Sequence, residues 1–214
     1  MDKTDVIEKD ILKRNVKNPL SFLLSNEIGG FFSTPVTGPL LSKFQGAAFC
    51  HFHERGWQLF KTIENIRHNK EIKGIVNNFH SFERYGDNFK EKFFMPYYYN
   101  ALVYETENLN EVELVLDVRE IHDFNTDGRV YKIYEENGNI IIEYKKYGRE
   151  EGRADSEHYS IYLVIDSDDI TYEKVERWEQ VEYTYDKYRG SQPWNWWVFN
   201  SIKIKPKQKA KIIF

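Results

Sequence analysis

Residues 19–50 read PLSFLLSNEIGGFFSTPVTGPLLSKFQGAAFC, an apolar stretch in which glycine and proline fall at closely spaced positions. Gly29 and Gly30 supply backbone freedom that residues with a Cβ atom lack, and Pro35 and Pro39 fix φ and remove backbone donors. This combination predicts packed strands joined by tight turns. Because such turns are geometrically demanding, the stretch is better suited to identify a family than to reveal a reaction.

The rest of the chain extends this pattern over 214 residues, of which 41% are hydrophobic. We expect one domain over residues 1–214, with residues 1–17 as a lead-in segment that is either helical or extended. Thirty basic and 34 acidic residues leave a net charge of −4, so nucleic acid is not an expected partner. The 16% aromatic content exceeds the usual need of a core this size, and is typical of β-sheets and of sugar-binding surfaces.

Cys50 is the lone cysteine, which excludes an internal disulfide and fits a reducing compartment. The N-terminal residues lack the continuous apolar core of a signal peptide, and no later run reaches membrane-spanning length. We therefore expect a cytoplasmic protein with no membrane partner.

Strand signals dominate after residue 17. β-Branched and aromatic residues, often in alternation, mark the segments 58–66, 74–82, 101–107, 112–118, 130–135, 139–145, 160–165 and 201–214. The count and spacing predict a mainly all-β fold, an antiparallel sandwich with a few short helices or crossovers. Two segments depart from this rhythm. The polar residues 147–158 predict a solvated loop, and residues 170–189, with apolar spacings of three and four, predict a short helix or an irregular crossover.

The densest cluster of reactive groups is DVREIHD at 117–123. Arg119, His122 and the flanking carboxylates would suit a general acid–base site, but the interpretation we favour is that they organise the turn after a strand. His51 and His53 lack further ligands at a recognisable spacing, and no phosphate-binding, dinucleotide or serine-nucleophile motif occurs. We predict no catalytic residue, no metal and no cofactor.

Two aromatic clusters are better candidates for function, and both place rings on the two faces of an extended segment. One face of each segment must therefore pack against something else, which is the protein core, another protein domain or a saccharide. A saccharide would stack its C–H faces on the rings, while side-chain amides hydrogen-bond its hydroxyl groups. The carbohydrate-binding candidates are Tyr97, Tyr98, Tyr99, Trp194, Asn195, Trp196 and Trp197.

Four further segments occur in an order that is more specific than any one of them. They are LLSNEIGG at 23–30, holding Asn26, Gly29 and Gly30; KFQGAA at 43–48, holding Gly46; REIH at 119–122, with Arg119 and His122; and YDKYRG at 185–190, ending in Arg189 and Gly190. Together they resemble the N-terminal domain of archaeal and bacterial glycogen debranching enzymes of the amylo-α-1,6-glucosidase type. Gln45 stands where that family commonly has histidine, and the acidic residue expected before the Arg-Gly pair is displaced or absent.

The resemblance implies a β-supersandwich that packs on an (α/α)₆ glucosidase barrel and positions or binds α-glucan, such as glycogen or a maltooligosaccharide. The barrel is absent from residues 1–214 and carries the catalytic carboxylates in such enzymes, so we expect no enzymatic activity from this chain alone. The alternative is a structural interaction module without sugar affinity, which docks a separate catalytic subunit or a second copy of itself. A third hypothesis is a self-contained enzyme that uses Arg119 and His122.

Overall fold

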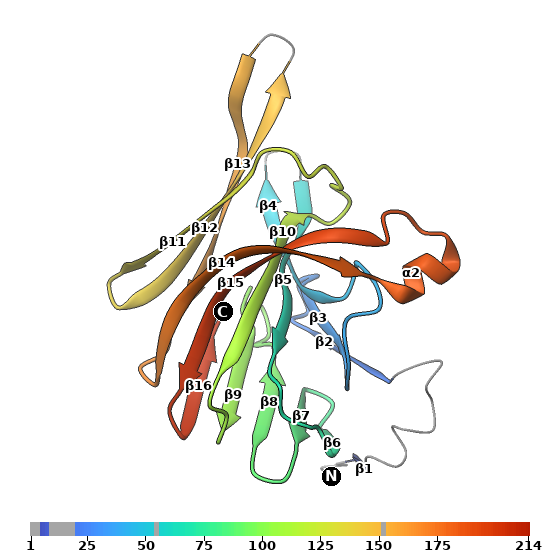
Figure 1. Cartoon of the computed structure of the whole chain (residues 1–214), viewed down its shortest axis with the longest axis vertical. Helices are drawn as coiled ribbons and strands as arrows, with labels where there is room; N and C mark the ends of the chain where they lie inside the picture. The colour runs from blue at the N-terminus through green and yellow to red at the C-terminus, as the bar shows by residue number, and fades with distance from the viewer. Residues whose placement is uncertain (1–4, 9–19, 54–55, 151–152) are drawn as a thin grey trace.

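The computed structural model describes residues 5–8, 20–53, 56–150 and 153–214 (Figure 1). Its strands, in chain order, are β1 (Asp5–Glu8), β2 (Ser21–Ser25), β3 (Phe31–Pro35), β4 (Gly46–His53), β5 (Gly56–Arg67), β6 (Gly74–Asn77), β7 (Ser81–Tyr85), β8 (Lys90–Phe94), β9 (Val103–Glu107), β10 (Val112–Glu120), β11 (Arg129–Glu136), β12 (Asn139–Glu150), β13 (Arg153–Ile165), β14 (Ile170–Glu182), β15 (Asn195–Pro206) and β16 (Lys209–Ile213). The helix α2 (Thr184–Arg189) lies between β14 and β15. Of the expected lead-in segment, residues 5–8 are described and form β1; the remainder lies outside the described residues.

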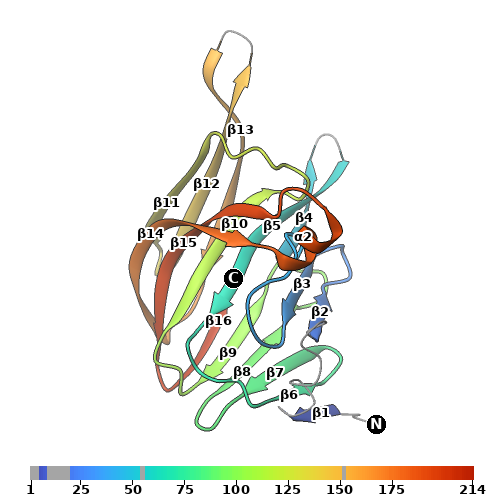
Figure 2. The ribbon, with the colours of Figure 1, turned by 45° about the vertical axis from the view of Figure 1, so that its right-hand side comes forward.

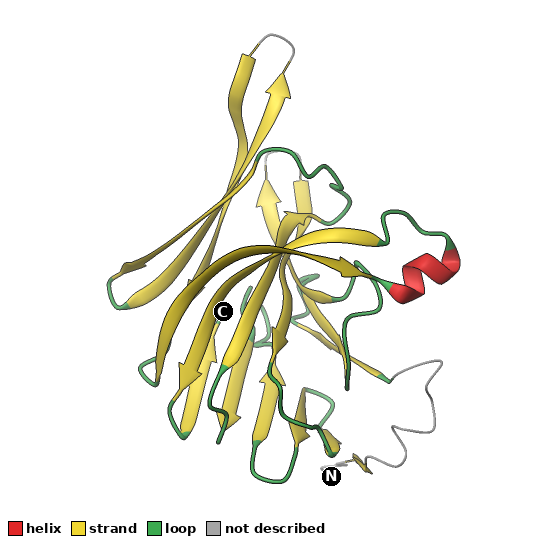
Figure 3. Cartoon of the chain, in the orientation of Figure 1, coloured by secondary structure: helices red, strands yellow, loops and turns green. Residues whose placement is uncertain are grey.

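Three antiparallel sheets build two layers (Figures 1 and 2). A seven-stranded sheet in the order β14-β15-β10-β5-β4-β3-β2 forms one layer. The other layer joins a six-stranded sheet, β1-β6-β7-β8-β9-β16, to a three-stranded sheet, β11-β12-β13, through a bridge between Asp166 and Ile213. Figure 3 shows that strands account for most of the described chain. The predicted mainly all-β antiparallel sandwich is confirmed.

The core between the layers is rich in aromatic rings. In β2, SFLLS alternates exposed and buried positions, so Phe22 points inward and stacks on Phe82 of the facing sheet with centroids 4.1 Å apart. The ring centroid of Phe93 lies 4.9 Å from that of Phe82 and 4.8 Å from that of Tyr104. Full burial of each such side chain contributes on the order of 1.5–3 kcal/mol. The alternation within residues 19–50 therefore fixes which face of the sheet enters the core.

A buried carboxylate sits among these rings on the inner side of the six-stranded sheet. Glu91 is closed off from solvent. It accepts two hydrogen bonds from Arg84, at 3.0 and 3.1 Å, and one from the Tyr104 hydroxyl at 2.7 Å. His68 Nε2 lies 2.8 Å from its carboxylate. Burial alone would raise the pKa of Glu91, but the charge of Arg84 and the bonds from His68 and Tyr104 outweigh it and lower the pKa to about 2. This group is therefore ionised in the folded protein at neutral pH.

The predicted loop at 147–158 is wrong. Strands β12 and β13 run through it and pair Tyr147 with Glu157 and Gly148 with Ser156, and Figure 1 shows the hairpin projecting beyond the other strands. Pairing of β11 with β12 ends at Lys146, so in the part of the chain that the structure describes the ribbon beyond this point consists of β12 and β13 paired with each other. Such a ribbon needs no apolar alternation, so its polar sequence resembled that of a loop.

The helical interpretation of 170–189 holds at its end, where α2 covers Thr184–Arg189, and is wrong for Ile170–Glu182, which is strand β14. A bulge between Lys174 and Arg177 shifts the register of this edge strand. After the bulge, Trp178 packs on the core side and Val181 on the opposite side. Apolar residues on both faces produce the spacing of three that suggested a helix.

Candidate functional site

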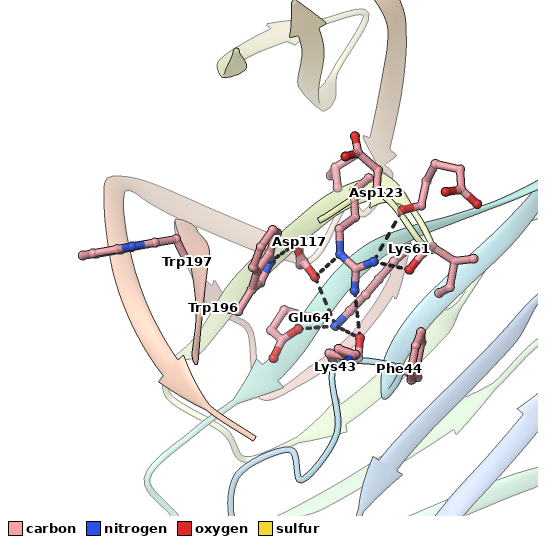
Figure 4. Close-up of polar contacts among 12 residues, drawn as sticks. Lys43, Phe44, Lys61, Glu64, Asp117, Asp123, Trp196 and Trp197 are labelled. Carbon is pink, nitrogen blue, oxygen red and sulfur yellow. Dashed lines mark hydrogen bonds and ion pairs between the residues drawn. The ribbon is translucent and has the colours of Figure 1, made fainter. Parts of the chain in front are cut away.

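Three of the sequence motifs converge on the outer face of the seven-stranded sheet, the face turned away from the core (Figure 4). The backbone carbonyl of Lys43 accepts hydrogen bonds from Lys61 Nζ at 3.0 Å and from Arg119 Nη2 at 2.9 Å. The Lys43 amide donates to Oδ2 of Asp186, a residue of α2, at 2.7 Å. Its ammonium donates to the carbonyl oxygens of Ser191, at 2.8 Å, and Gln192, at 2.6 Å. Segments 43–48, 119–122 and 185–190 thus meet through one residue.

Asp117 of β10 is the centre of this buried network. It accepts hydrogen bonds from Trp196 Nε1 at 2.7 Å, Arg119 Nε at 2.9 Å and Arg129 Nη2 at 3.0 Å, and Lys61 Nζ lies 3.3 Å away. Burial would raise the pKa of Asp117, but the three cations and the indole bond lower it far below its usual range. The carboxylate is therefore a fixed negative charge that links β10 to β5, β11 and β15.

Glu64 of β5 lies on the other side of Lys61, and its pKa is shifted in the direction opposite to that of Asp117. It pairs with Lys61 and accepts the Tyr183 hydroxyl at 3.1 Å. Burial, with the negative charge of Asp117, outweighs the attraction of Lys61 and raises the pKa of Glu64. Carboxylates whose pKa values are pushed apart are a feature of acid–base sites, but the side chains of Glu64 and Asp117 are only 3% and 0% exposed. Both carboxylates are enclosed by side chains of the same network.

The motif residues in this region have structural contacts. A Cβ atom on Gly46, where φ is +106°, would lie 2.3 Å from the carbonyl oxygen of Ile63, so no other residue fits there. Arg119 donates to the Ile121 carbonyl and places its guanidinium 4.6 Å from the Phe124 ring centroid. His122 is exposed at the surface. The structure directs Arg119 inward and His122 outward, and so does not assemble them into one site.

Arg189 and Gly190 end helix α2. Arg189 Nη2 donates to Asp186 Oδ1 at 2.9 Å, and its guanidinium lies 4.4 Å from the Tyr185 ring centroid. Gly190 caps the helix in the left-handed conformation, with φ +68°. Asp186 in turn binds the Lys43 amide, so the Arg-Gly pair holds the helix against the network.

The motif LLSNEIGG at 23–30 lies outside this network, at the turn between β2 and β3. Asn26 is fully buried, and its Oδ1 accepts the Gly30 amide at 2.8 Å. Its Nδ2 donates to the Tyr99 carbonyl at 2.9 Å, and its own carbonyl accepts the Tyr98 amide at 2.9 Å. A Cβ atom on Gly30 would lie 2.5 Å from Asn26 Nδ2. Glycine is required at position 30 because Asn26 must pass close to it to reach the tyrosines.

The candidates Tyr97, Tyr98 and Tyr99 form the exposed turn that Asn26 holds. Their side chains are 54%, 69% and 68% exposed. Asn100, the next residue, donates from Nδ2 to the Cys50 carbonyl of β4 at 2.7 Å. Gly29 lies on the other side of Cys50, against its sulfur. The turn is therefore fixed at two points while its three rings face solvent.

The tryptophan cluster divides between interior and surface. Trp196 is 4% exposed and is committed to Asp117, whereas Trp197 points to the opposite face of β15 and is 47% exposed (Figure 4). Trp194 is half-buried and Asn195 is exposed. The carbonyl of Trp194 accepts the Tyr183 amide at 2.7 Å. The surface part of this cluster is thus Asn195 and Trp197.

Sequence reasoning missed a further pair of exposed rings, Phe52 and Trp57. They lie directly opposite each other on β4 and β5, 74% and 67% exposed, with ring centroids 5.5 Å apart in an edge-to-face arrangement. The signal lay in the segment 51–58, HFHERGWQ, where the pairing of His53 with Gly56 sets the register that places the two aromatic positions opposite each other.

Within residues 5–8, 20–53, 56–150 and 153–214, no group of His, Cys, Asp and Glu is arranged to hold a metal ion. No helix in these same ranges is both long enough and apolar enough to cross a membrane. Comparison of the chain with models of protein families, with curated proteins and with solved structures gave no match.

Proposed function

We propose that this chain is a non-catalytic domain, related to the N-terminal domains of glycogen debranching enzymes, that binds α-glucan and packs on a glucosidase barrel supplied elsewhere. The glucan site is the turn of Tyr97, Tyr98 and Tyr99. The observation that carries the proposal is that three consecutive rings face solvent on a turn anchored by Asn26 and Asn100.

The anchoring favours binding for an entropic reason. A ligand that must order a mobile loop loses part of its interaction free energy to that ordering, whereas a turn already fixed by hydrogen bonds loses little. The three phenol rings offer flat apolar faces to the C–H faces of sugar rings, and their hydroxyl groups offer donors and acceptors at the rim. This combination suits an amphipathic, uncharged ligand.

The buried carboxylates support a role without catalysis. Asp117 and Glu64 are closed off by Lys61, Arg119, Trp196 and Tyr183. Catalytic carboxylates must reach the reacting atoms, and these two bind only groups of their own chain. In this proposal the network stiffens the sheet, and hydrolysis belongs to the barrel.

The test is retention of the chain in native gels containing glycogen, together with calorimetric titration with maltooligosaccharides. Tyr97→Ala and Tyr99→Ala are each expected to weaken binding roughly two- to tenfold, the loss of about 0.5–1.5 kcal/mol of ring contact. Tyr188→Ala, which removes a largely exposed tyrosine from α2, is the matched control and should bind like the parent. A folded parent that shows no binding at millimolar sugar contradicts the proposal.

A second candidate function, a protein interaction module, is favoured by strand β2. This strand forms one edge of the seven-stranded sheet, and Leu20 and Leu23 on and beside it are exposed. An edge strand with an exposed leucine offers a surface for pairing with another chain. Sedimentation velocity over a range of concentrations tests this. If the chain is an interaction module that pairs with itself, we expect it to associate as its concentration rises, and Leu23→Ser should abolish this association. A chain that stays monomeric at all concentrations contradicts self-pairing.

A further inference from the structure

The β4–β5 ribbon extends beyond the strands on either side of it. Pairing of β4 with β3 ends at Ala48, and pairing of β5 with β10 ends at Phe60. The hairpin beyond these points is two-stranded, and Figure 1 shows it rising past its neighbours. Phe52 and Trp57 lie on this part, where no other strand among the described residues pairs with β4 or β5.

The two rings have a simple structural role to consider first. A cross-strand aromatic pair contributes modestly to the stability of a hairpin. That contact uses the edge of one ring and part of one face of the other, and at 74% and 67% exposure most of both rings stays in water. The exposed area is thus larger than hairpin pairing requires.

The tyrosine turn is anchored to the same ribbon. Asn100 donates to the carbonyl of Cys50 at 2.7 Å, and Cys50 precedes Phe52 by two residues along β4. Two residues of a strand span roughly 7 Å. The segment that carries Tyr97–Tyr99 is therefore attached close to the base of the Phe52–Trp57 pair.

The geometry points to Phe52 and Trp57 as a second stacking platform for the α-glucan bound at Tyr97–Tyr99, so that the site takes a linear oligosaccharide of several units. This inference rests on the proposed function. Hydrogen-bonded polar groups, Asn100 and the Cys50 carbonyl, separate the two sets of rings. Such an interruption suits a ligand that alternates apolar faces with hydroxyl groups, whereas a protein interface has a continuous apolar centre.

Two platforms on one fixed scaffold have a quantitative consequence. Once a chain is held at the first platform, contact with the second is intramolecular and gains from a high effective concentration. A short sugar that covers one platform lacks this gain. Affinity should therefore rise with chain length in the parent, and the rise should depend on Trp57.

The experiment is calorimetric titration of the whole chain with maltotriose and with maltoheptaose. The parent is expected to bind maltoheptaose about tenfold more tightly. Trp57→Ala should lose most of this preference while its affinity for maltotriose stays unchanged, and Trp57→Phe should recover part of it. Tyr97→Ala should weaken the binding of both sugars, and Tyr188→Ala should match the parent. Thermal melts of each variant confirm that it is folded.

The outcomes separate the two proposals. If Trp57→Ala keeps the full preference for maltoheptaose while Tyr97→Ala weakens both sugars, the second platform is wrong and the tyrosine site stands. The same conclusion follows if the parent binds both sugars equally. If the folded parent binds neither sugar, the proposed function fails and the second platform fails with it.

Discussion

The outer faces of the two layers use the same charged residues in opposite ways. On the six-stranded sheet, Lys92 lies 3.4 Å from Glu105 and Lys209 lies 3.4 Å from Glu107, with all four side chains partly or largely in water. On the seven-stranded sheet, Asp117 and its partners are almost completely buried. Exposed pairs contribute little to stability, whereas removal of one member of a buried network leaves uncompensated charge. The contrast shows that the environment of an ion pair, more than its geometry, decides its energetic weight.

The largest expected effect comes from removing the charge at the centre of the buried network. Asp117→Asn keeps the shape of the side chain but leaves Lys61, Arg119 and Arg129 without their common anion. We expect the free energy of unfolding in urea to fall by about 3–5 kcal/mol. The control, Glu107→Gln on the exposed face, should change it by less than about 1 kcal/mol. Equal losses of stability for the two substitutions would contradict the conclusion that burial decides the energetic contribution of an ion pair.

The next effect depends on pH and concerns Glu91. Its pKa is about 2 in the folded protein against an ordinary value of 4.5, so folding favours the ionised form. The resulting stabilisation is fully present above pH 4.5 and is lost as the pH falls towards 2; its total is about 3 kcal/mol. Urea unfolding at pH 7, 4.5, 3 and 2 measures the loss. In Glu91→Gln the same range should show a shallower fall, and an unchanged slope would contradict the assignment.

A smaller effect is expected from the neutral contacts that anchor the tyrosine turn. Asn26→Ala leaves the Gly30 amide and the Tyr99 carbonyl without partners, which costs about 1–3 kcal/mol in the free energy of unfolding. Because the turn loses its anchor, binding to glycogen should weaken as well. Native gels of Asn26→Ala and Asn100→Ala beside the parent measure the second effect. Full retention by a destabilised but folded Asn26→Ala would show that the turn needs no anchor.

The weakest coupling is expected for an exposed ion pair, Lys92 with Glu105. A double-mutant cycle on Lys92 and Glu105 should give a coupling energy of about 0.2–1 kcal/mol. In 1 M salt, where the Debye length is about 3 Å, this coupling should vanish. The same salt should leave the loss in Asp117→Asn nearly unchanged, because its partners are shielded from solvent. Salt sensitivity of both would mean that the network is open to water.

Much of the fold follows from local sequence pattern. Alternation in β2 identifies its buried face, and Asn137-Gly138 forms the β11–β12 turn with φ of +52° and +83° at the two residues, as the hairpin signal indicates. The pattern fails where a strand does not divide into one apolar and one polar face. Residues 147–158 are largely polar in sequence, and β14 carries packed apolar residues on both faces, Trp178 on one and Val181 on the other.

The candidate site was predictable only in part. Tyr97–Tyr99 are adjacent in sequence and need no register to be found. Phe52 and Trp57 become a pair only once the hairpin register is known, and Trp196 and Trp197 are distinguished by which face of β15 is covered. The charges of DVRE resemble surface residues in sequence, because their burial depends on partners 50 to 80 residues away, such as Lys43 and Trp196.

The shared carbonyl of Lys43 has a consequence for local opening of the chain. Residues 36–45 have no regular secondary structure, and segments of this kind usually exchange their amide protons soon after transfer to heavy water. Here the Lys43 amide is held by Asp186, and its carbonyl satisfies both Lys61 and Arg119. Lifting the segment would leave two buried cations short of an acceptor at once. The connection therefore opens together with the sheet beneath it, and exchange at Lys43 should be as slow as in β10.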